Sequence, residues 1–97
     1  MTAATYARED TDPYEHLSDA SERLNAALAN VAESPLYALG ALADVRVNVD
    51  AAILILVRQL RLARPPASWE AIGDALGISK QAAHERYARQ VHQDGYL

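Results

Sequence analysis

The chain contains no cysteine, no phenylalanine and a single lysine, Lys80. The absence of cysteine excludes disulfides and thiolate metal sites, and it suits a reducing compartment. The longest apolar run, residues 51–57, is far shorter than the roughly 20 residues that span a bilayer. Residues 1–8 hold no apolar segment of signal-peptide length. We therefore expect a soluble, cytoplasmic protein that contacts no membrane.

Patterns for long β-strands are also missing, whereas alanine is abundant. Because alanine has the highest helix propensity, the composition predicts an all-α fold. The 97 residues are enough for one domain with a short arm. A chain this short buries only about two-thirds of the surface that it exposes when unfolded. Self-association is therefore a natural way to bury more.

Charge is divided unevenly along the chain. The formal net charge is −4, which at first disfavours a nucleic-acid partner, because phosphate binding needs positive potential. Residues 1–44 hold eight acids and two arginines, a net charge of −6, whereas residues 45–97 hold five acids and seven bases, a net charge of +2. Only the C-terminal half therefore suits a DNA surface.

Two helices are expected in the N-terminal half, after a flexible arm over residues 1–11 that lacks periodicity. Asp12 can cap the first helix and Pro13 suits its first position. One face of that helix carries an apolar stripe at helical spacing, and the reverse face is charged: Tyr14, Leu17, Ser21, Leu24, Leu28 and Val31. Ser34-Pro35 repeats the signal and opens a second helix through residue 42.

Residues 44–49 are ambiguous, since their valines alternate as in a strand but no partner strand is available. We interpret this segment as a turn that leads into a third helix over residues 49–64. Residues 53–57 make that helix apolar nearly all round, so it must be buried in its own core or in a partner's. Arg58, Arg61 and Arg64 form a basic edge, and Pro65-Pro66 ends the helix. Residues 12–64 are thus the predicted helical core and dimerisation region.

Residues 68–79 combine several helix-boundary signals. Ser68 can cap a two-turn helix on which Trp69, Ile72 and Leu76 share one face. Gly73 costs about 1 kcal/mol inside a helix, which a second helix crossing closely at this point would explain. Gly77 ends the helix in the left-handed conformation, and Ser79 caps the next one, over residues 80–91. Ile78 then fills the turn and points into the core.

The last helix has two distinct faces. Ala83, Tyr87 and Val91 recur every four residues and are expected to point inward. Gln81, His84, Glu85 and Ala88 share an outward stripe, with Lys80 at its N-terminal edge. Small and polar side chains on such a face suit a helix that reads the major groove of DNA.

Residues 68–89 resemble the helix-turn-helix of sigma-factor region 4 and a form common in small actinobacterial regulators, Ser-Trp-x-x-Ile-Gly-x-x-Leu-Gly-x-Ser-x-Gln-Ala-Ala. Ala83 departs from the pattern, because the family usually has a larger, branched residue there. The resemblance implies that four residues read bases: Lys80, Gln81, His84 and Glu85. It also implies phosphate-contacting or supporting roles for four others: Trp69, Ser79, Arg86 and Arg89. Trp69 fits a core or rim position better than a direct DNA contact.

The sequence thus predicts a small transcriptional regulator that binds double-stranded DNA as a homodimer, with residues 65–97 as its helix-turn-helix region. No enzyme chemistry is indicated, because a nucleophile–histidine–acid set and a glycine-rich phosphate loop are both missing. No cofactor is expected, and His84 and His92 lack a third metal ligand. Two alternatives stay open: the C-terminal helices act as a docking module, or the acidic N-terminal helices bind a protein partner, as in a sigma-like adaptor.

Overall fold

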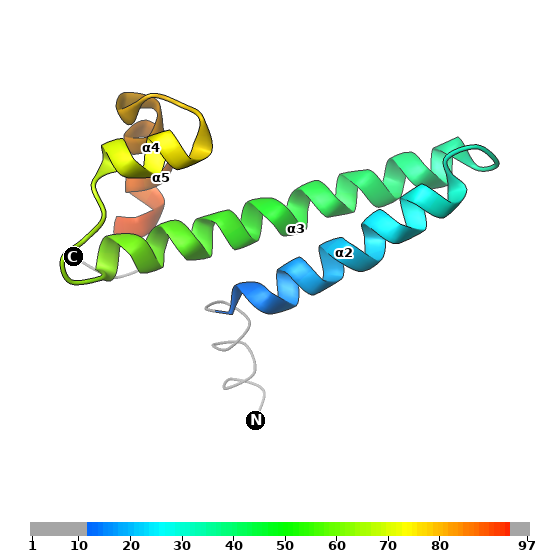
Figure 1. The fold of residues 1–97 in the computed structure, drawn as a ribbon, viewed down its shortest axis with the longest axis horizontal. Helices are drawn as coiled ribbons and strands as arrows, with labels where there is room; N and C mark the ends of the chain where they lie inside the picture. Colours follow the sequence, from blue (N-terminus) through cyan, green and yellow to red (C-terminus); the bar gives the residue numbers. More distant parts are fainter. Residues whose placement is uncertain (1–11, 94–97) are drawn as a thin grey trace. The chain divides into compact units, whose positions relative to one another are not determined.

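The computed structural model describes residues 12–93, and within this range every regular element is an α-helix (Figure 1). The helices are α2 (Pro13–Asn30), α3 (Pro35–Leu62), α4 (Trp69–Leu76) and α5 (Lys80–Gln93). The all-α prediction is confirmed, and the predicted arm over residues 1–11 lies outside the described residues. The chain divides into two compact units, at Ile55 and Leu56, and each is described by itself.

Helix α2 begins as the sequence predicts. The Asp12 side chain accepts a hydrogen bond of 2.9 Å from the backbone N–H of Tyr14, and Pro13 occupies the first helical position. The cap satisfies one of the amides that a helix N-terminus leaves without an intrahelical partner.

Helix α3 is one continuous helix of 28 residues. The predicted turn over residues 44–49 is therefore wrong, and so is the division into two helices. A valine costs less than about 0.7 kcal/mol relative to alanine in a helix, so alternating valines do not prevent one when packing favours it. The half-buried Val45 belongs to the row of α3 that faces α2. The helix ends at Leu62 rather than at residue 64, because the residue before Pro65 disfavours helical dihedrals.

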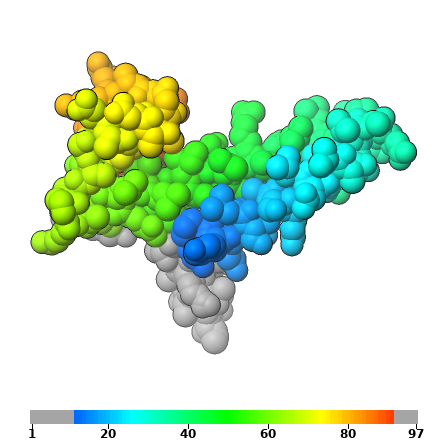
Figure 2. All heavy atoms as spheres, in the orientation of Figure 1, coloured from blue at the N-terminus to red at the C-terminus, as the bar shows by residue number. Residues whose placement is uncertain are grey.

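Helices α2 and α3 form an antiparallel hairpin (Figure 1). The Ser34 N–H donates to the Asn30 carbonyl at 2.8 Å, and the Ser34 carbonyl accepts from Ala38 at 3.0 Å, so the connection is short. Figure 2 shows the side chains of α2 lying against α3 along the hairpin. Between the helices lie small side chains that are almost fully buried: Ala20, Ala27, Ala38, Ala41 and Ala52. The apolar stripe predicted for α2 does not lie in this contact and is exposed.

The second unit has a core of larger side chains, drawn from the end of α3 and from both short helices: Val57, Ile72, Ala83, Tyr87, Ala88 and Val91. The inward orientation predicted for Ala83, Tyr87 and Val91 is confirmed. The outward position predicted for Ala88 is wrong, because the buried face of α5 is wider than a row of every fourth residue and includes the neighbour of Tyr87. None of the helices within residues 12–93 is long and apolar enough to cross a bilayer.

Candidate nucleic-acid interface

Helix α4 is fixed at its start by Ser68. The Ser68 Oγ accepts a hydrogen bond of 3.0 Å from the Ala71 N–H, and the Ser68 carbonyl accepts one of 3.0 Å from the Ile72 N–H. Ile72 is buried, while Trp69 and Leu76 are half-buried on the same face. The predicted cap and the predicted inner face of this helix are both confirmed.

A three-residue turn joins α4 to α5. Gly77 adopts the left-handed conformation, with φ 75° and ψ 26°. The Ile78 N–H donates to the Gly73 carbonyl at 2.9 Å, and the Gly77 N–H donates to the Asp74 carbonyl at 3.2 Å. This pair of bonds is the Schellman arrangement, which satisfies two carbonyls at the end of a helix. The role predicted for Gly77 is confirmed.

Gly73 is necessary for a different reason from the one that its position suggested. A Cβ atom at Gly73 would lie 2.8 Å from the Ile78 carbonyl oxygen and 2.9 Å from that of Ser79. The close neighbour is thus the backbone of the turn, not a second helix crossing at this point, as we expected. The turn folds back tightly over α4, and that contact sets where α5 begins.

Helix α5 starts at a second serine cap, where the Ser79 Oγ accepts a hydrogen bond of 3.0 Å from the Ala82 N–H. The four residues predicted to read bases are all exposed on the first two turns of α5: Lys80, Gln81, His84 and Glu85. Arg86 and Arg89 are exposed as well. Because Ala83 is fully buried, these outward positions are set by the packing of the same helix.

Two of the predicted base readers are bonded to each other. The Gln81 Nε2 donates a hydrogen bond of 3.3 Å to the Glu85 Oε2, one turn along α5. A glutamine amide has two N–H donors and a carbonyl acceptor, so this bond leaves one donor and the acceptor available. Glu85 can therefore orient the Gln81 amide, and the amide still has one N–H donor and its carbonyl acceptor available for another contact.

Trp69 links three parts of the unit. The Arg61 guanidinium lies 4.9 Å from the centre of the Trp69 ring, and Arg61 Nη1 donates to the Ala67 carbonyl at 2.8 Å. On α5, the His84 ring meets Trp69 edge-on, with a centroid distance of 5.4 Å. Sequence reasoning missed this cluster, because the spacing of Arg61 from residues 58 and 64 indicated only a basic helix edge.

The two units differ in the sign of their net charge. Residues 56–93 hold six bases and three acids, a net charge of +3, whereas residues 12–55 hold two bases and seven acids, a net charge of −5. Arg64, Lys80, Arg86 and Arg89 are all exposed. An anionic polymer is therefore attracted to the second unit and repelled by the first.

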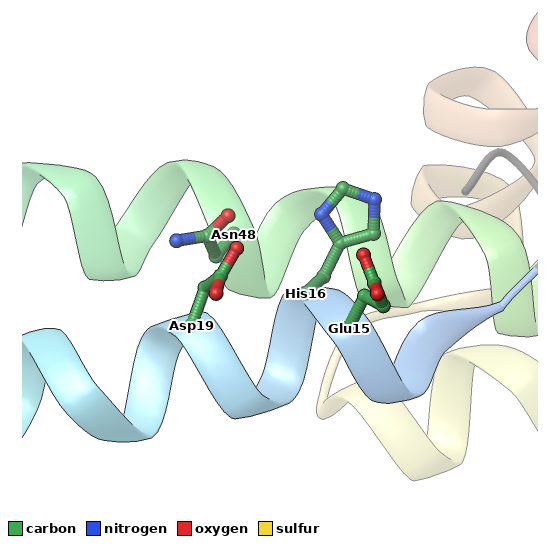
Figure 3. Close-up of a pocket in the computed structure, with 4 residues that line it drawn as sticks. All are labelled: Glu15, His16, Asp19 and Asn48. Atoms are coloured by element: carbon green, nitrogen blue, oxygen red, sulfur yellow. The ribbon is translucent and has the colours of Figure 1, made fainter. Parts of the chain in front are cut away.

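The hairpin also carries a polar pocket of about 180 Å³ (Figure 3). It is lined by Glu15, His16 and Asp19 of α2 and by Asn48 of α3. Within residues 12–93, no group of three or more histidine, cysteine or acidic side chains is placed to hold a metal ion. The residues that line the pocket are thus not arranged as a metal site.

No protein-family model, curated protein or solved structure matches the chain. The features of the molecule that bear on function are therefore the geometry of α4, the turn and α5, together with the charge of the second unit.

Proposed function

We propose that the chain binds double-stranded DNA sequence-specifically, as a small cytoplasmic transcriptional regulator that acts as a dimer, with α4, the turn and α5 serving as a helix-turn-helix. One observation carries the proposal. Four buried residues anchor one face of α5, and the opposite face presents four polar side chains directly after the turn: Lys80, Gln81, His84 and Glu85. A recognition helix needs this combination of a fixed inner face and a polar outer face at its N-terminal end.

The chemistry of the exposed face suits base edges in the major groove. Lysine bonds the acceptors of guanine, glutamine forms a paired contact with adenine, and glutamate accepts from the amino group of cytosine. The bond between Gln81 and Glu85 supports a paired adenine contact, because the amide keeps the one donor and one acceptor that adenine requires. Glu85 then acts as a positioning residue for Gln81, in addition to any base contact of its own.

The remaining basic side chains are candidates for phosphate contacts. Arg86 and Arg89 are exposed further along α5, where a helix in the groove approaches the DNA backbone. Arg61 is a poorer candidate, because its guanidinium is already engaged by Trp69 and the Ala67 carbonyl. We therefore assign Trp69 and Arg61 a supporting role, in which they hold His84 and the start of α4 in place.

A second candidate function is supported by the charge of the hairpin. Residues 12–55 carry a net charge of −5, which suits a basic surface on another protein better than it suits DNA. In that function the acidic helices of the first unit would bind the partner. The two candidates differ in which unit meets the ligand, so one experiment can separate them.

The test is a selection of bound sequences from a random DNA pool, followed by titration of a selected duplex at several salt concentrations. The logarithm of the binding constant should fall linearly with the logarithm of salt, with a slope of about −4 to −6 for roughly five or six phosphate contacts. A scrambled duplex of the same composition is the control, and its affinity should be lower by a factor of at least about 1,000. A pool that shows no enrichment, with no binding at low salt, would overturn the proposal in favour of a protein partner.

A further inference from the structure

We propose that the α2–α3 hairpin binds a second copy of this chain through one apolar face, so that two hairpins form a four-helix bundle. The proposal rests on the dimer that is part of the proposed function. It does not depend on DNA binding. We call this surface the seam face and define it by two rows of residues. The row on α2 is Tyr14, Leu17, Ser21, Leu24, Leu28 and Val31, and the row on α3 is Leu39, Leu42, Arg46, Val49 and Ile53.

Both rows have the spacing of coiled-coil helices. Their members alternate three and four residues apart, which is the heptad pattern that places knobs into the holes of a facing helix. In α2 the row is exposed throughout, with Leu24 at 51% and Leu28 at 73% of full exposure. In α3, Leu39 and Leu42 are exposed as well, while Val49 and Ile53 are half-buried. Heptad rows of this kind contribute to stability when another helix packs against them and buries them.

The two rows lie on the same side of the hairpin. In each helix, a seam residue directly follows a buried alanine that faces the other helix, as Leu28 follows Ala27 and Leu42 follows Ala41. One residue turns a helix by about 100°. Since both helices turn the same way along their own direction but run antiparallel, the two rotations lead to one common face. The hairpin therefore presents both rows together.

Matching positions also produce regular layers across the seam face. Arg23 and Asp44 are paired at 3.2 Å, which shows the register in which the two helices lie. In that register Leu28 lies level with Leu39, and Leu24 lies level with Leu42. The two polar members of the rows, Ser21 and Arg46, fall at one shared level. A single polar layer between apolar layers is a device that fixes register and oligomeric state in helical bundles.

Burial of this face by a partner would be energetically favourable. Its own contact buries mainly alanines, each contributing roughly 0.8 kcal/mol for one methyl group. The leucines of the seam face would each contribute about 1.5–3 kcal/mol if they were fully buried. The larger part of the apolar free energy available to α2 and α3 is thus unused within one chain.

A second copy fits this face better than a different protein does. A two-fold interface brings a surface against itself, so that surface must not carry a strong net charge. The seam rows hold one charge, Arg46, which has no ion-pair partner within the described residues. Asp50 borders the row one turn later and can pair with Arg46 of a second copy, twice across a two-fold axis. A cationic partner would be expected to bind at the acidic side chains. These lie outside the seam rows: Glu15, Asp19, Glu22 and Asp44.

The experiment is sedimentation equilibrium of the full chain without DNA. The parent should be a dimer at micromolar concentration. Leu24→Glu or Leu42→Glu should weaken dimerisation at least about 100-fold, since each places two carboxylates in the apolar interface. Val47→Glu is the matched control, because Val47 is 67% exposed, more than Leu24 or Leu42, but points away from both α2 and the seam face. Its dimerisation constant should change less than about threefold.

Arg46→Leu is a second variant, which is expected to strengthen the dimer. A gain of this kind cannot result from unfolding. Removing the charged member of the polar layer should tighten dimerisation by about tenfold or more and permit other oligomeric states. A monomeric parent would overturn the proposal, and so would a Leu42→Glu dimer as tight as the parent or a loss of dimer in Val47→Glu. Failure of DNA binding with the dimer intact would contradict only the proposed function. A DNA-binding monomer would contradict this inference and the dimer of the proposed function, but not DNA binding.

Discussion

The two units of the chain use apolar residues in opposite ways. The hairpin buries alanines between its helices and leaves leucines such as Leu24 and Leu28 exposed, whereas the second unit buries Ile72, Tyr87 and Val91 and exposes polar side chains. The second unit thus has a core of larger side chains and a polar outer face on α5, although Leu56, Leu60 and Leu62 at the end of α3 are exposed as well. The hairpin has the composition of half a bundle. In the proposed function the two units have separate tasks: one presents the binding helix, and the other presents an apolar face for assembly.

The two units also differ in which residues determine their shape. The second unit depends on single residues at its boundaries: two serine caps, and the glycines at 73 and 77. The hairpin depends on a long repeat, in which no one position decides the fold. Substitutions of glycine by alanine should therefore have opposite consequences in the two units.

The largest effect is expected for Gly73→Ala. Its new Cβ would lie 2.8 Å from a backbone oxygen that cannot move without opening the turn. We expect a loss of about 2–3 kcal/mol, near the upper end of the range for overpacking. For a domain of this size the melting temperature should fall by roughly 10–20 °C.

Gly40→Ala is the matched control in the hairpin. A Cβ at Gly40 would meet nothing within 4 Å, so the substitution should stabilise α3 by about 0.5–1 kcal/mol. Thermal denaturation followed by circular dichroism measures both variants. If Gly73→Ala melts with the parent, the turn does not approach α4 as described.

Gly77→Val should have the next largest effect, for a reason that involves no contact. A Cβ at Gly77 meets open space, but φ is 75°, a conformation that branched side chains avoid. We expect a loss of about 1–3 kcal/mol, and a parallel loss of DNA affinity. Gly77→Asn is the control and should cost less, because asparagine tolerates the left-handed region. Equal melting temperatures for Gly77→Val and the parent would be incompatible with this turn.

The sequence predicted the second unit well because its signals are local. Ser68, Gly77 and Ser79 each act on amides or dihedrals within a few residues of themselves, and the alternation of Ala83 with Gln81 shows which face of α5 is buried. The cluster of Arg61, Trp69 and His84 could not be predicted, since it depends on how three segments meet.

The hairpin was predicted less well, because its packing depends on contacts between segments that are distant in the sequence. The caps at Asp12 and Ser34-Pro35 gave the correct helix starts, but the valines at 45, 47 and 49 suggested a break that packing overrides. The stripe through Leu17 and Leu24 was identified correctly as apolar. A periodic pattern does not say whether its cover is the same chain or another, and here the row against α3 is the alanine row.

The central claim, that α5 reads DNA, is tested most directly by comparing Gln81→Ala with Arg89→Ala. Binding of both variants to a selected duplex and to random DNA should be measured by fluorescence anisotropy across a salt series. Gln81→Ala should lose about 1–3 kcal/mol on the selected duplex and little on random DNA. Arg89→Ala should weaken binding to all sequences alike and lower the salt slope by about one. Both residues are exposed, so both variants should melt like the parent. Equal weakening of selected and random DNA by Gln81→Ala, or no effect of either variant, would contradict the claim.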